Sequence, residues 1–313
     1  MKISFGVKLA VSAFIIGLIF YRFDIKLGEL FTQFTETKYL LIALTFPLCI
    51  NHIITNNRWK LLLSSIGVKE SFWTLVKINL SSTFVGLALP SSQGYDAIRI
   101  YKIEKLHPEN KGVGCTVVIE RIIGLVCLCS IGIVASLFID VLEVKMFIYV
   151  FSFIVASAIF ILFNERCYSY LNKILSSFNR FKRIFTYLAK LHEATYSFPL
   201  RKNIVGTVLL ILLFQFNNIL VVYLLFKATG TDIPLVYHLV AMPVISIISL
   251  VPITISGIGV RDGAFVFMYA FVGISHDVIV GVSIVNYIII SLLPAFIGSF
   301  FYLSESLRHG HKK

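Results

Sequence analysis

Long apolar stretches separated by short polar segments dominate this chain. A membrane-spanning helix needs about 20 consecutive, mostly apolar residues, and stretches of about that length recur along the sequence. The pattern predicts six spanning helices, at residues 3–21, 39–56, 113–139, 144–163, 204–229 and 278–304. We therefore expect an all-α polytopic membrane protein.

Two further apolar regions are too interrupted to cross a membrane as single helices. Residues 72–89 carry Lys77 and Asn79 and end at Pro90. Residues 237–275 are broken near the middle by a proline and two glycines, which leaves two half-length apolar pieces. Irregular backbone at membrane depth is tolerated where it is buried in protein or lines a cavity. Both regions therefore predict helical hairpins that enter the membrane and turn back.

The distribution of Lys and Arg sets the expected topology, because cytoplasmic loops collect positive charge. Residues 164–203 hold eight Lys and Arg against two Glu, so this segment is placed inside. Residues 140–145 and 227–236 hold one Lys each and are placed outside. The basic loops expected at 56–71 and 90–112 then fall inside only if residues 72–89 return to the side from which they entered. Residues 237–275 must likewise leave from and return to the outside, so that the last helix ends in the cytoplasm. Both termini are expected in the cytoplasm.

This topology divides the chain into two halves, residues 1–139 and 140–313, within a single membrane domain. Each half reads helix, helix, hairpin, helix, and the halves start on opposite sides. Such inverted repeats place broken helices together near the membrane midplane, where they form the substrate site. Within the basic segment 164–203, apolar residues recur at three- and four-residue steps. This spacing predicts an amphipathic helix on the inner membrane surface.

The amino-acid composition agrees with the apolar pattern and argues against a soluble domain and against a nucleic-acid-binding protein. Of 313 residues, 58% are hydrophobic and 14% charged, with a mean hydropathy of +0.88. Soluble domains have about 25% charged residues. The net charge of +12 lies in short loops, as expected beside an anionic inner leaflet, and does not indicate nucleic-acid binding.

The five cysteines show neither disulfide nor metal-ligand spacing, so we expect no metal and no cofactor. The first apolar stretch lacks a cleavage site and is expected to remain as a helix of an inner-membrane protein.

Charged residues inside the apolar regions of the first half need an explanation, because a charge at a helix centre costs about 2.5–3.5 kcal/mol on insertion scales. Arg58 is followed by Trp59 and Lys60, so it is either an interface anchor or a site residue. The other candidates are polar residues of the first hairpin and a pair inside the following helix, namely Gln93, Asp96, Arg99, Glu120 and Arg121.

Glu120 and Arg121 cannot share one partner, because adjacent residues on a helix do not face each other. The hairpin charges are the expected partners of both. Buried salt bridging and contact with a ligand remain alternative roles for this pair.

The stretch ISGIGVRDGAF in the second hairpin has the features of an anion site. Gly257 and Gly259 permit a tight turn, after which a half-helix begins with free N–H groups. Arg261 adds a bidentate fork suited to phosphate, and Asp262 would orient it. The alternative is a hairpin tip in outer water with an incidental ion pair.

Four motifs, in this order, carry a family resemblance: NRWKLL, ALPSSQGYDAIRIYKI, VVIERIIGL and VPITISGIGVRDGAF. Together they resemble the lysylphosphatidylglycerol synthase transmembrane region, also called the flippase-like domain family, over nearly the whole chain. The chain departs from the family pattern at Tyr95, Ser256 and Asp262, where glycine, glycine and glutamate are usual. The resemblance implies lipid handling, and without a soluble synthase domain in these residues it implies no synthesis.

The sequence therefore favours a lipid translocase that binds an anionic head group, either phospholipid or polyprenyl-phosphate-linked, between the two hairpins. A membrane-embedded transferase using Asp96 or Glu120 as base is one alternative. An accessory subunit for enzymes of envelope lipid or glycan synthesis is another. The expected partner is an anionic membrane lipid, and enzyme activity is not expected.

Overall fold

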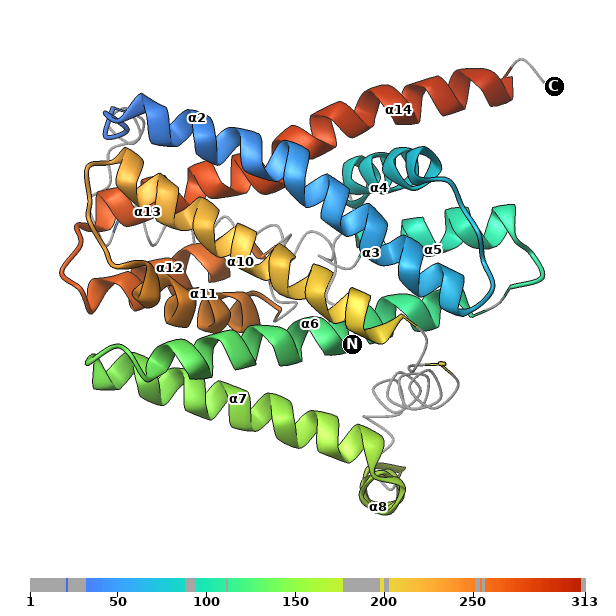
Figure 1. The fold of residues 1–313 in the computed structure, drawn as a ribbon, viewed down its shortest axis with the longest axis horizontal. Coiled ribbons are helices and arrows are strands. Elements are labelled where there is room, and N and C mark those ends of the chain that lie inside the picture. The colour runs from blue at the N-terminus through green and yellow to red at the C-terminus, as the bar shows by residue number, and fades with distance from the viewer. Residues whose placement is uncertain are drawn as a thin grey trace.

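The computed structural model describes residue 21 and residues 32–87, 94–110, 112–176, 198–199, 203–250, 254 and 257–310, with backbone alone for 305–310 and for most of 171–176. The described part of the chain folds entirely into helices and connecting turns (Figure 1). The expected all-α polytopic fold is confirmed.

Five helical rods among the described residues are long and apolar enough to cross a membrane. They coincide with five of the six predicted spans, and the first predicted span, 3–21, lies outside the described residues. The rods are α2 (Thr37–Thr45) with η1 (Phe46–Asn51) and α3 (His52–Ser65); α6 (Val113–Ser136); α7 (Leu142–Phe163); α10 (Ile204–Ala228); and α13 (His276–Tyr287) with η4 (Ile288–Leu292) and α14 (Leu293–Gly310).

Two pairs of short helices lie at the interrupted apolar regions, and the helices of each pair pack against each other. The first pair is α4 (Phe72–Leu87) with α5 (Gly94–Leu106), and the second is α11 (Leu235–Ser249) with α12 (Val260–Ala270). The breaks at 88–93 and around Pro252 lie outside the described residues. One expectation is wrong: residues 72–89 were expected to turn back within themselves, whereas residues 72–87 form the single helix α4. The second arm, α5, is formed by residues 94–106 of the segment expected as a basic loop, and this helix packs against α4 with Asp96 and Arg99 buried.

The two hairpins make reciprocal contacts across the fold. Helix α4 of the first hairpin packs along α14 at the end of the chain, and α11 of the second hairpin packs along α6. Helix α10 lies centrally and contacts α2, α3, α6, α11 and α13 (Figure 1). Each hairpin is therefore held by the last long helix of the opposite half of the chain.

Helix α8 (Glu165–Ser176) begins the basic segment and extends from the far end of α7 (Figure 1). Its helical form agrees with the expected amphipathic helix over this first part. Residues 177–197 and 200–202 of the same segment lie outside the described residues.

The contact between α4 and α14 depends on a glycine. A Cβ atom built on Gly298 would lie 1.9 Å from the carbonyl oxygen of Leu80. The backbones of the two helices therefore lie closer together than a side chain at position 298 would permit. Close packing at small residues is a common way for helices to associate in membranes.

We expect Gly298→Ala to destabilise the protein by about 1–3 kcal/mol, because the added methyl group must push the two backbones apart. Thermal unfolding of the purified protein in detergent measures this loss. Gly114→Ala is the matched control, since a Cβ there meets nothing within 4 Å and alanine favours a helix. Equal melting temperatures of the two variants would contradict the close approach.

The side of the membrane occupied by α8 can be tested at Cys167, which is a free, partly exposed thiol on this helix. In a variant retaining Cys167 as its one cysteine, we expect a membrane-impermeant maleimide to label it in inverted vesicles and not in intact cells. Labelling in intact cells would overturn the assigned topology and with it the opposite orientation of the two halves.

Candidate anion-binding site

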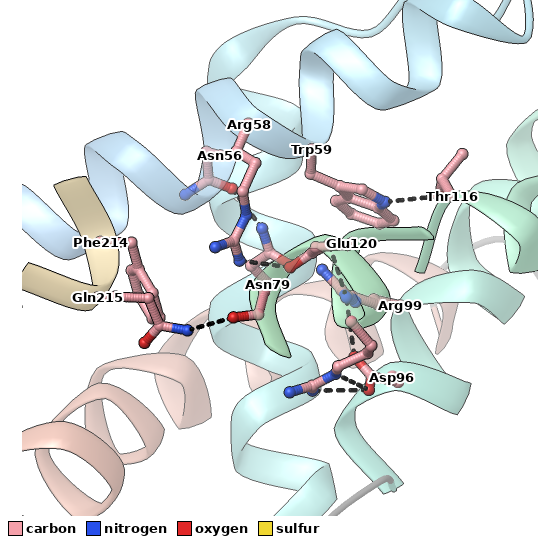
Figure 2. Close-up of polar contacts among 12 residues, drawn as sticks. Asn56, Arg58, Trp59, Asn79, Asp96, Arg99, Thr116, Glu120, Phe214 and Gln215 are labelled. Atoms are coloured by element: carbon pink, nitrogen blue, oxygen red, sulfur yellow. Dashed lines mark hydrogen bonds and ion pairs between the residues drawn. The ribbon is translucent and has the colours of Figure 1, made fainter. Parts of the chain in front are cut away.

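Five charged side chains from α3, α5 and α6 form a continuous chain of ion pairs, here named the charge cluster: Arg58, Asp96, Arg99, Glu120 and Arg121. Arg58 Nη2 donates to Glu120 Oε1, and Arg99 Nη2 donates to Glu120 Oε2 at 3.1 Å. Arg99 Nη2 also lies 2.8 Å from Asp96 Oδ1, while Arg121 binds Asp96 Oδ2 through Nη2 at 2.8 Å and Nε at 3.2 Å. Figure 2 shows Arg58, Glu120, Arg99 and Asp96 following one another between the helices.

Local helix geometry explains how the cluster assembles. Asp96 and Arg99 are three residues apart on α5 and so lie on one face. Glu120 and Arg121 are adjacent on α6 and point to different partners, Glu120 to two arginines and Arg121 to Asp96. The expectation that the first hairpin supplies partners for this pair is confirmed.

Arg58 is not the interface anchor that its sequence neighbours suggested. Its side chain is 8% exposed and bonded to Glu120. Trp59 is fully buried, and its Nε1 donates to Thr116 Oγ1 at 3.2 Å. The reason for the difference is that α3 packs against α6 over these residues, which the sequence pattern does not show.

Aromatic rings hold the two most deeply buried guanidinium groups. The Arg99 guanidinium carbon lies 4.8 Å from the ring centre of Trp59 and 4.9 Å from that of Tyr95. The Arg58 guanidinium lies 4.8 Å from the ring of Phe214 on α10. Such contacts stabilise a cation where water is excluded.

A second set of polar contacts fixes the ring of Tyr95. Its hydroxyl donates to Asn79 Oδ1 at 2.8 Å, and Asn79 Nδ2 donates to Asn56 Oδ1 at 2.5 Å. Sequence reasoning assigned none of these three residues, nor Trp59 or Phe214, to the site. The polar Asn79 within an apolar stretch was a usable signal, whereas the aromatic residues resembled ordinary membrane residues.

The charge cluster contains more positive charge and more donors than its own acceptors satisfy. Three arginines face two carboxylates. Among the described residues, Arg58 Nε and Arg99 Nε and Nη1 are buried without a hydrogen-bond partner. Arg99 and Glu120 are 1% and 7% exposed, whereas the Arg121 side chain is 53% exposed. An anion reaching the cluster past Arg121 would meet unfilled donors.

The second hairpin holds a smaller group at the start of α12. Gly257 and Gly259 have φ values of +75° and +88°, which favour glycine. Asp262 accepts from the backbone N–H of Gly259 at 2.8 Å, from Ser283 Oγ at 2.5 Å and from Arg261 Nη2 at 2.8 Å. The predicted turn and the orienting contact from Asp262 are therefore present.

Arg261 is not part of a water-exposed hairpin tip. Its side chain is 14% exposed, its guanidinium carbon lies 4.7 Å from the ring centre of Tyr287, and its Nε is buried without a partner. Among the described residues, no hydrogen bond or ion pair joins this group to the charge cluster, so a shared ligand site stays a prediction. Gln93 lies outside the described residues.

No group of three or more His, Cys, Asp or Glu side chains within the described ranges could hold a metal ion. The donors gathered here are guanidinium and backbone N–H groups, which bind anions rather than cations. Chemically, the arrangement suits a phosphate or another oxyanion.

Comparison with known proteins agrees with these features. The family model of the lysylphosphatidylglycerol synthase TM region matches residues 6–298. The chain is similar to a "UPF0104 membrane protein" of Methanothermobacter thermautotrophicus strain Delta H. The two are 24% identical over an alignment of 321 positions, which covers 92% of this chain and 89% of the relative. No solved structure matches. Both polar groups lie within the matched region, and the chain belongs to the lysylphosphatidylglycerol synthase transmembrane-region family.

Proposed function

We propose that this protein is a lipid translocase of the inner membrane that binds an anionic lipid head group. The observation that supports the proposal most directly is the charge cluster, with its surplus arginine, which joins the first helical hairpin to the long helices α3 and α6. Intramembrane charges of this kind mark substrate pathways.

Stability alone gives little reason for such a cluster. Taking charges out of water costs several kcal/mol per ion, and apolar replacement of a buried ion pair is often neutral or stabilising. The unfilled donors of Arg58 and Arg99 add to this cost. A ligand anion that filled these donors would offset it, which is the role we assign to the head-group phosphate.

The two halves of the chain provide a route for movement of the head group. We propose that residues 1–139 and 140–313 form an inverted repeat, in which the hairpins α4–α5 and α11–α12 present Arg99 and Arg261 to the head group in turn. The reciprocal packing of each hairpin on the opposite half supports this arrangement. Rocking one hairpin against its partner helix would then open the site to alternate sides.

The contacts do not favour the transferase alternative. A general base needs a free lone pair directed at substrate, whereas both oxygens of Glu120 accept from arginines and Asp96 contacts two guanidinium groups. We therefore assign both carboxylates to holding arginines in position. A supporting role beside enzymes of lipid or glycan synthesis is compatible with the proposal and does not replace it.

Glu120→Gln is expected to reduce head-group translocation at least about tenfold, because it removes the negative charge that forms ion pairs with both Arg58 and Arg99. Glu143→Gln, at the start of α7, is the matched control and should translocate at the wild-type rate. Reconstituted vesicles with a fluorescent lipid and an impermeant quencher give the rate. Similar rates for the two variants would mean that Glu120 is dispensable.

Arg261→Lys is expected to leave the protein folded and to lose most translocation, since a point charge cannot replace a planar fork. Arg261→Ala should also weaken binding of anionic lipid. Lys60→Ala, an exposed cation on α3, should change neither quantity. Lipid binding and translocation are measured on purified variants that elute as a single folded species, and wild-type values for both Arg261 variants would remove this residue from the site.

A further inference from the structure

We infer that the charge cluster selects a head group with a single negative charge, and that its own net charge is the determinant of this selectivity. The inference rests on the proposed function and adds the charge state of the substrate. It follows from the sum of the charges of the five cluster residues and from the count of unfilled donors.

The charge count leaves one positive charge without a counterion. Arg58, Arg99 and Arg121 contribute +3 and Asp96 and Glu120 contribute −2, so the cluster carries 3 − 2 = +1. The four buried members sum to zero, so the surplus charge is that of Arg121, whose side chain is 53% exposed. A monoanion brings the sum to zero, whereas a neutral or zwitterionic head group leaves it at +1 and a dianion takes it to −1.

Two neighbouring cations lie outside the five-residue chain of ion pairs. Lys102, one turn beyond Arg99 on α5, donates to Ser81 Oγ on α4 at 2.7 Å. Arg261 in the second hairpin is matched by Asp262 at 2.8 Å, so that group is neutral by itself. The surplus belongs to the five residues of the charge cluster.

The hydrogen-bond count points the same way. Both oxygens of Glu120 and Oδ2 of Asp96 accept hydrogen bonds from guanidinium groups, and Asp96 Oδ1 lies 2.8 Å from Arg99 Nη2 without a hydrogen bond. Among the described residues, Arg58 Nε and Arg99 Nε and Nη1 have no acceptor. Three buried nitrogen atoms on two arginine side chains that are each more than nine-tenths buried therefore lack acceptors within the described part of the chain. The oxygens of one oxyanion group would supply them, and guanidinium N–H groups bind such oxygens strongly.

Arg121 provides the access that the buried members lack. Its side chain is half exposed, and a guanidinium does not face hydrocarbon, so this side of the cluster borders water or head groups. Arg121 is also the member that can move without leaving a carboxylate unpaired, because Asp96 keeps Arg99 at 2.8 Å. Removing the Arg121 charge should therefore change selectivity without collapsing the cluster.

The test is binding of lipids with identical acyl chains to the purified full-length protein in a neutral detergent. The lipids are phosphatidylglycerol, with one negative charge; phosphatidic acid, a phosphate monoester studied well above its second pKa so that it carries two charges; and zwitterionic phosphatidylcholine. We expect the wild type to bind the singly charged lipid about tenfold or more tightly than either of the others.

Two substitutions move the cluster charge in opposite directions. Arg121→Gln takes the sum to zero and should abolish the preference for the monoanion over the zwitterion. Asp96→Asn, which keeps the size of the side chain, takes the sum to +2 and should move the preference toward the dianion. Lys60→Gln removes one exposed positive charge outside the cluster and should keep the wild-type preference.

Equal binding of the singly and doubly charged lipids by the wild type would overturn the inference, as would an unchanged preference in folded Arg121→Gln. The preference of Arg121→Gln keeps the test decisive if Asp96→Asn fails to fold. Selective binding without any head-group movement in vesicles would instead count against the translocase proposal, so the two failures can be told apart.

Discussion

The pairing of Glu120 with Arg58 and Arg99 is the interaction on which this part of the fold depends. Glu120 lies on α6, Arg58 on α3 and Arg99 on α5, so one carboxylate joins two long helices to the first hairpin. Because charges taken from water need partners, none of these three elements can move independently without exposing an unpaired ion. The hairpin is thereby tied to the helices that surround it.

The same constraint explains the side chains around the cluster. Trp59 and Tyr95 enclose the guanidinium of Arg99, and the hydrogen bonds from Tyr95 through Asn79 to Asn56 fix the ring that does so. A buried polar network is stabilising only when its members are satisfied. Here both oxygens of Glu120 accept hydrogen bonds. Among the described residues, three nitrogen atoms of Arg58 and Arg99 lack a partner, against one oxygen, Asp96 Oδ1. This excess of donors is why the cluster resembles a receptor for an anion more than a structural salt bridge.

The second hairpin meets a similar requirement with different means. At the start of α12, two glycines with positive φ form the turn that precedes the helix. Asp262 caps the helix and also positions Arg261. The first group spreads its charges over three helices, whereas the second concentrates them in one turn with support from Ser283. The two hairpins thus differ in local construction although each is held by the opposite half of the chain.

The sequence by itself determined the class of fold and most of its elements. Apolar runs of about 20 residues are dictated by the thickness of the membrane, so five spans and both broken regions could be located from hydropathy alone. The charged residues of the site were also recognisable, because a charge within an apolar run is expensive wherever it points. Only the tertiary structure decided which charges meet, that Arg58 and Trp59 are buried rather than anchored at an interface, and that residues 94–106 form a hairpin arm. These outcomes depend on which faces of α3, α5 and α6 pack together, and helix periodicity shows that a face exists without showing what covers it.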